Sequence, residues 1–184
     1  MATDRPKADP SWIAAFTARY DAWLPEARSL IEARRYGDAF KTYPYPGPFT
    51  ETPWTEVATP LDATRLGVVT TAGVYRRGID APFEDTVEGD PRVVEVPTEA
   101  ALESLDVSHA HIPVEVARAD LNVVLPLDHL RDLVARRTLG RLAPRAFSLV
   151  GYRTRADDVA SVTAPAIARG MVEDGVTLAL VVPV

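Results

Sequence analysis

The stretch Glu173–Val184, EDGVTLALVVPV, decides the fold class. Gly175 can end a helix, and the run from Val176 to Val182 is almost wholly apolar and rich in β-branched residues. Such a run predicts a strand that is buried on both faces, as in a parallel sheet. In open α/β sheets, ligands and catalytic groups sit in the loops beyond the carboxyl ends of such strands. We therefore expect a functional site near Pro183 and Val184.

Upstream of this strand, short apolar runs alternate with helical segments. Strands are expected within residues 65–73, 92–97 and 145–152, and helices within residues 98–105, 126–140 and 164–175. Thr98 should begin the first of these helices and Gly140 should end the second. This alternation predicts an α/β layered fold with a mainly parallel sheet flanked by helices.

The first 65 residues have a different pattern. Ser11 can cap a helix, and an aromatic stripe that starts at Trp12 should face an apolar surface until Pro25 interrupts or kinks the helix. The segment Tyr43–Trp54 carries four prolines, which favour an extended covering segment over the alternative of a polyproline ligand. We therefore divide the chain into residues 1–65, packed on the core, and an α/β core at 66–184, C-terminally incomplete.

Composition excludes several classes of function. The 184 residues contain no cysteine, so disulfides, thiolate zinc sites and thiol chemistry are excluded within them. A net charge of -6 without a basic stripe argues against nucleic-acid or anionic-membrane partners. With no signal region and no apolar run near ~20 residues, we expect a cytoplasmic protein.

The histidine pair in SHAHIP is the main candidate for chemistry. His109 and His111 flank one residue, a spacing that could bind a metal, serve a substrate or a proton transfer, or be structural. A metal would need a third ligand from elsewhere in the chain, and we expect no bound metal. Ser108, His109 and Asp120 are the residue types of a hydrolase triad, but no G-x-S-x-G elbow supports one.

Several motifs resemble one known family. LGVVTTAGVYRRGIDAPFE, GDPRVVEVP, SHAHIP, ADLNVVLPLDHLRDLV, LAPRAFSLVGY and PAIARGMVEDGVTLALVVPV follow one another as in the selenoprotein B family of glycine, sarcosine, betaine and D-proline reductases. The resemblance runs from about Leu66 to Val184, and the size is similar to that of the D-proline reductase type subunit. It implies a substrate-binding rim near the end of the final strand, formed by Thr71, Gly73, His109, His111, Asn122 and Tyr152.

The resemblance also implies an activity, the reductive cleavage of a carbon–nitrogen bond in an amino acid or N-methylated glycine. In this family a selenocysteine or cysteine directly after the final strand is the nucleophile, and a pyruvoyl group on a partner subunit can activate the substrate. No such nucleophile is among the 184 residues, so we expect it just after Val184. Expected partners are other reductase subunits or a second copy, and a small amino-acid-like substrate.

Two explanations for the missing nucleophile stay open. A selenocysteine codon, UGA, can be read as a stop, which would leave a catalytically incomplete chain. The rival is a genuinely shortened relative that acts as a non-catalytic interaction or scaffold subunit. We favour the first, because a buried final strand would otherwise lack the cover of a following crossover.

Overall fold

The structure, a computed structural model, describes residues 11–47 and 55–184, which form two compact units. One unit holds the described residues up to Glu56 together with Arg155–Ser161. The other holds Val57–Thr154 and Val162–Val184. The division expected at residue 65 stays a prediction, and each unit is described by itself.

The first unit is built around one aromatic cluster. Its elements are the helices α1 (Ser11–Glu32), α2 (Tyr36–Ala39) and α5 (Ala156–Asp158) and the 3₁₀ turn Phe40–Thr42. Phe16 and Tyr20 on α1 are fully buried, and Trp23 stacks edge-on against Tyr43 at 5.1 Å. The hydroxyl of Thr17 donates to Asp157 Oδ2 at 2.7 Å, which ties α5 to α1. The expected burial of the aromatic stripe is confirmed.

Of the two effects expected at Pro25, the interruption is wrong, because α1 continues through it to Glu32, and the kink stays a prediction. A proline inside a helix removes one hydrogen bond and costs ~3 kcal/mol. Residues on both sides of it, Trp23, Ala27 and Ile31, are at most 5% exposed. Their packing on one face offsets the local cost.

The second unit contains a mixed sheet in which most pairs are parallel, as predicted. Its strands are β1 (Arg65–Thr70), β3 (Val94–Pro97), β5 (Arg141–Leu142), β6 (Arg145–Ser148) and β7 (Leu178–Val182). Strand β1 lies at the centre, with β5 and β6 on one side and β7 on the other, all parallel to it. Only β3 is antiparallel, to β6. A separate antiparallel pair, β2 (Val74–Arg76) with β4 (Leu105–Val107), was not predicted.

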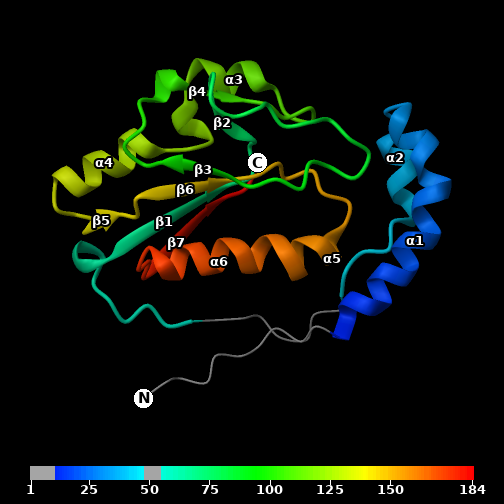
Figure 1. Ribbon diagram of the computed structural model, residues 1–184, viewed down its shortest axis with the longest axis horizontal. Coiled ribbons are helices and arrows are strands. Elements are labelled where there is room, and N and C mark those ends of the chain that lie inside the picture. Colours follow the sequence, from blue (N-terminus) through cyan, green and yellow to red (C-terminus); the bar gives the residue numbers. More distant parts are fainter. Residues whose placement is uncertain (1–10, 48–54) are drawn as a thin grey trace. The chain divides into compact units, whose positions relative to one another are not determined.

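Helices cover the two faces of this sheet, as the α/β pattern predicts (Figure 1). On one face, α6 (Ala164–Glu173) packs Ile167 and Met171 against Val69 and Phe147. On the other face, α3 (Val114–Ala119), α4 (Leu127–Ala135) and the β2–β4 pair close over a larger core that includes Val68 and Leu127. The unit β6–α6–β7 is thus a crossover that passes over β1.

Two helix boundaries differ from the prediction. In place of the helix expected at residues 98–105 there is only the 3₁₀ turn Leu102–Ser104 before β4 begins at Leu105. Thr98 is buried, and its hydroxyl donates to Ala143 O instead of capping a helix. Helix α4 ends at Ala135, and the residue with a positive φ after it is Arg137, not Gly140. Local sequence does not reveal such tertiary contacts.

The expectation that the final strand is buried on both faces is wrong. Among the described residues β7 pairs only with β1, and the side chain of Val181 is 58% exposed. Leu178 and Leu180 on the opposite face are partly buried against the core. The apolar run therefore forms an edge strand with one covered face.

The expectations for the proline-rich segment and for membrane-spanning helices can be compared only with the described residues. The part of Tyr43–Trp54 from residue 48 to 54 lies outside them. Within the described ranges, no helix is long and apolar enough to cross a membrane.

Candidate functional site

Thr71 joins the carboxyl ends of the central strands. Its backbone N–H donates to Val182 O at 3.1 Å, and its carbonyl accepts from the N–H of Gly151 at 2.8 Å. Its hydroxyl oxygen accepts from the N–H of Val184 at 2.8 Å. The ends of β1, β6 and β7 therefore meet at this residue, as expected for parallel strands.

Gly73 links this edge to the histidine segment. Its carbonyl accepts from the N–H of Ser108 at 3.0 Å, and its N–H donates to Leu149 O at 2.9 Å. Its φ is +70°, and a Cβ at this position would lie 2.3 Å from the carbonyl oxygen of Ser108. Only glycine permits both the backbone conformation and the close approach.

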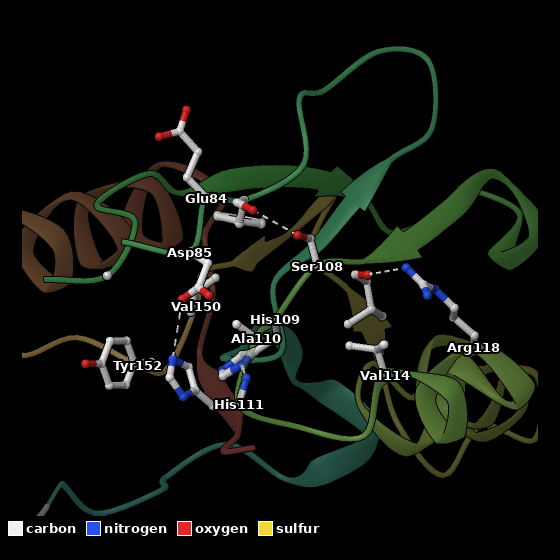
Figure 2. Close-up of a pocket in the computed structure, with 13 residues that line it drawn as sticks. Glu84, Asp85, Ser108, His109, Ala110, His111, Val114, Arg118, Val150 and Tyr152 are labelled. Carbon is white, nitrogen blue, oxygen red and sulfur yellow. Dashed lines mark hydrogen bonds and ion pairs between the residues drawn. The ribbon is translucent and has the colours of Figure 1, made fainter. Parts of the chain in front are cut away.

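A cavity of about 250 Å³ lies beside Gly73, within the second unit. Figure 2 shows it between the loop that carries Glu84 and Asp85, the segment from Ser108 to Arg118, and the loop after β6 with Val150 and Tyr152. Its size suits a small metabolite, since drug-sized pockets begin at about 300 Å³. The lining residues are Phe83, Glu84, Asp85, Gly89, Val107, Ser108, His109, Ala110, His111, Val114, Arg118, Val150 and Tyr152.

His109 is the most buried polar side chain of the lining, at 7% exposed. Its Nδ1 accepts a hydrogen bond from the backbone N–H of His111 at 3.1 Å. Burial lowers the pKa of His109, and the nearby His111 lowers it further, against a smaller opposing effect of Asp85. The ring is therefore neutral near pH 7.

His111 stands between an aromatic ring and a carboxylate. It stacks on Tyr152 with ring centroids 3.9 Å apart, and its Nε2 lies 3.8 Å from Asp85 Oδ1. The hydroxyl of Tyr152 donates to Val87 O at 3.3 Å. If His111 is protonated, it lies close enough to Asp85 to form an ion pair.

Asp90 fixes the conformation of the loop that carries Glu84 and Asp85, the acidic loop. It is 2% exposed, accepts from the N–H of Glu84 at 2.8 Å and is ion-paired to Arg92. Burial by itself would raise the pKa of Asp90, but hydrogen bonds from Arg92 and from the backbone N–H groups of Glu84 and Arg92 outweigh it and lower the pKa. The fixed loop directs Asp85 towards His111, whereas the carboxylate of Glu84 points away from the histidines (Figure 2).

Arg118 on α3 supplies the opposite charge. Its Nε donates to Asp106 Oδ1 at 2.8 Å, and a terminal nitrogen donates to Val107 O at 3.1 Å. Figure 2 shows Arg118 on one side of the pocket and Glu84 and Asp85 on the other. The lining therefore contains charged groups of both signs, although the charge of Arg118 is paired with Asp106.

The structure brings most of the predicted rim residues into one region. His109, His111 and Tyr152 line the pocket, Gly73 packs against Ser108, and Thr71 contacts Val184. Asn122 is not a lining residue. It lies in the 3₁₀ turn Leu121–Val123, and its Oδ1 accepts from the N–H of Asp128 at the start of α4. A substrate-binding role for any of these residues stays a prediction.

Neither a metal site nor a triad is assembled by the residues that the structure describes. They contain no group of three or more histidines and carboxylates able to hold a metal ion. The hydroxyl of Ser108 donates to Phe83 O at 2.8 Å, away from His109. Asp120 instead accepts from the N–H of Asn122.

Sequence reasoning missed the charged residues of the pocket. Glu84 and Asp85 sit in a polar segment that looks like a solvated loop, and Arg118 looks like the polar face of a short helix. Their motifs resemble those of the family, but nothing in their spacing distinguishes them. Only the tertiary fold brings them into the lining of the same pocket as the histidines.

The structure shows an α/β protein with a small pocket, lined by charged residues of both signs, beside the carboxyl ends of its strands. Residues 32–183 match the family model of the glycine/sarcosine/betaine reductase selenoprotein B. The chain belongs to this family, as the sequence motifs predicted.

One curated relative is the D-proline reductase subunit gamma of Acetoanaerobium sticklandii. It is 30% identical over 134 residues, which cover 72% of this chain and 54% of the relative. The chain thus spans about half the length of the relative that it matches. No solved structure matches the chain significantly.

Proposed function

We propose that this chain is a subunit of a reductase that cleaves a carbon–nitrogen bond in an amino acid or an N-methylated glycine. One observation carries the proposal: the family match at residues 32–183 contains every residue that lines the pocket. The curated relative is itself named as a subunit of D-proline reductase. Other reductase subunits are the proposed partners.

The pocket has the chemistry that such a substrate needs. A small amino acid carries a cationic nitrogen and a carboxylate a few ångströms apart. Asp85 offers a carboxylate to the nitrogen, and His109 offers a neutral ring on another side. The wall formed by His111 and Tyr152 would limit the size of the substituents.

The nucleophile is not among the 184 residues, and we propose that it follows Val184, as the family resemblance implies. The geometry supports this position. A Cβ on Gly151 would lie 3.2 Å from the carbonyl oxygen of Val184, and Gly151 separates the lining residues Val150 and Tyr152. A group attached after Val184 would therefore lie beside the pocket wall.

A selenol at that position would supply an anionic nucleophile at neutral pH, where a thiol with a pKa of ~8.5 is mostly protonated. It would bond to the α-carbon while the carbon–nitrogen bond breaks and the amine leaves with a proton. A thiol would then take the selenium while the α-carbon gains a proton, and an external dithiol would reduce the selenium–sulfur bond. A pyruvoyl group on a partner subunit is the proposed activator of the substrate.

The proposal is tested by reading the codons after Val184 and by reconstitution. We expect UGA, followed in frame by a segment with cysteine. With UGA replaced by a cysteine codon, the longer chain mixed with its pyruvoyl-bearing partner and a dithiol should cleave D-proline, sarcosine, betaine or glycine. The 184-residue form should not. A UAA or UAG codon, or no cleavage of any of the four, would contradict the proposal.

The alternative is a non-catalytic interaction subunit, and one observation favours it. Strand β7 exposes Val181, and on the adjacent α6 the side chain of Val172 is 68% exposed. An apolar edge strand can pair with a strand of another chain. Stable complex formation with a partner subunit, without any cleavage by the longer chain, would favour this function.

A further inference from the structure

The hydrogen-bonding state of His109 is fixed by its neighbour in the chain. The N–H of His111 donates to Nδ1, so Nδ1 acts as the acceptor. In a neutral imidazole the proton then sits on Nε2, which becomes a donor. The contact from residue 109 to the N–H of residue 111 has the geometry of an Asx turn, with the imidazole in place of an asparagine side chain.

The Nε2–H donor of His109 has no hydrogen-bond partner among the described residues, although its atom is buried. Most buried polar atoms in proteins are hydrogen-bonded, and a donor left without a partner is costly. The residue lines the cavity and is 7% exposed. A ligand with an acceptor atom in this cavity would satisfy the donor once the atoms that cover Nε2 move aside.

The charges around the cavity indicate which acceptor that is. The ion pair with Asp106 neutralises Arg118, so its charge is partly satisfied within the protein. Asp85 would repel an anion on its own side of the cavity and attract a cation. Figure 2 draws His109 between Asp85 and Arg118. An anionic acceptor would therefore avoid the acidic loop and meet Nε2–H.

We propose that Nε2–H of His109 binds the carboxylate of the substrate, while Asp85 faces its cationic nitrogen. This inference rests on the proposed function and deepens it, because it assigns an orientation to the substrate. Amino acids and N-methylated glycines differ in the number of hydrogens on nitrogen but share the carboxylate. A neutral donor suits that group, since it gives a charge-assisted hydrogen bond without burying a second charge.

Two variants separate the two nitrogens of His109. In His109→Asn, the side-chain oxygen can still accept from the N–H of His111, because asparagine forms this turn itself, but the donor at Nε2 is lost. In His109→Gln, the longer amide can place an N–H where Nε2–H was, while the turn is lost. His109→Asn should therefore keep the stability of the wild type but bind carboxylates weakly. His109→Gln should lose stability but bind carboxylates more tightly than His109→Asn does.

The experiment is an NMR titration of the 184-residue chain, observing the side-chain nitrogens of its histidines. The probes are acetate, which has only the carboxylate, pyrrolidine, which has only the amine, and sarcosine and D-proline, which have both. Acetate, sarcosine and D-proline should shift the Nε2 signal of His109, and pyrrolidine should not. His109→Asn should raise the dissociation constants of the three carboxylates about tenfold or more, which is the loss of affinity expected when a charge-assisted hydrogen bond is removed.

Every outcome decides the question. The inference is overturned if the wild-type chain binds none of the carboxylates, if His109→Asn binds them as tightly as the wild type, or if pyrrolidine alone shifts His109. Thermal unfolding of both variants shows whether a loss of binding comes from a loss of structure. Acetate binding does not depend on the reductase reaction, so a failed cleavage assay and a failed titration are distinguishable.

Discussion

The imidazole of His111 lies flat against the phenol ring of Tyr152, with ring centroids 3.9 Å apart and ring planes inclined by 23°. His111 belongs to the segment after β4, and Tyr152 to the loop after β6. The stack therefore connects two loops that are distant in the sequence and forms one wall of the pocket (Figure 2). This wall depends on the second unit being folded.

Removing the stack should weaken the pocket. We expect Tyr152→Leu to lower the free energy of unfolding by ~0.5–1.5 kcal/mol beyond the lost burial, the worth of an aromatic pair. Tyr152→Phe is the matched control, because it keeps the stack and removes the hydroxyl that donates to Val87 O. Urea unfolding measures both. Equal losses in the two variants would show that the hydroxyl, not the stack, matters.

Gly73 should be far less tolerant than another glycine with the same backbone conformation. Gly73 and Gly78 have similar φ angles, +70° and +71°. A Cβ added to Gly73 would lie 2.3 Å from the backbone oxygen of Ser108, whereas a Cβ added to Gly78 would have no neighbour within 4 Å. We expect Gly78→Ala to cost about 1 kcal/mol of stability, from φ alone. Gly73→Ala should cost several times more and displace the His109 segment. Comparable melting temperatures for the two variants would disprove the close approach.

The burial of His109 should make the stability of the protein depend on pH. Burial lowers its pKa below 6.5, so the folded state takes up the proton later than the unfolded state as the pH falls. The stability contributed by neutral His109 is therefore full above pH 6.5 and decreases as the pH falls from there to the folded pKa. In His109→Asn this loss should disappear. Histidine NMR signals and urea unfolding between pH 7.5 and 5 test it, and a folded pKa above 6.5 would refute it.

Arg145 should contribute more to stability than a surface arginine. It is ion-paired to Glu95, Glu173 and Asp174, and its hydrogen bonds to Asp174 and Glu95 raise its pKa. We expect Arg145→Met to cost ~1–3 kcal/mol, because Asp174 is 11% exposed and would lose its partner. The control Arg136→Met breaks an exposed pair with Asp132 and should change stability by less than ~0.5 kcal/mol. Chemical denaturation of both variants gives the comparison.

The two faces of β7 should respond differently to a charge. Val181→Lys should leave the fold intact and reduce any self-association, because its side chain is 58% exposed on an edge strand. Leu180→Lys should destabilise by ~2–4 kcal/mol, because Leu180 packs on the core. Light scattering measures association, and circular dichroism measures folding. Unfolding by Val181→Lys would show that this face is covered.

The sequence by itself determined the layered α/β fold, the mainly parallel sheet and the family. These follow from local information: apolar runs of strand length, helical periodicity and ordered motifs. The helix 164–175 and the strand that became β1 were placed within a few residues. The histidine segment was also located, because SHAHIP is unusual in a chain with three histidines.

Only the tertiary structure decided the rest. It turned Thr98 from a helix cap into a buried donor to Ala143 O, let α1 continue through Pro25, and left β7 at an edge. It also brought Asp85 and Tyr152 to His111. Each of these outcomes depends on contacts between residues far apart in the chain, whose free energies exceed local propensities and leave no periodic signal in the sequence.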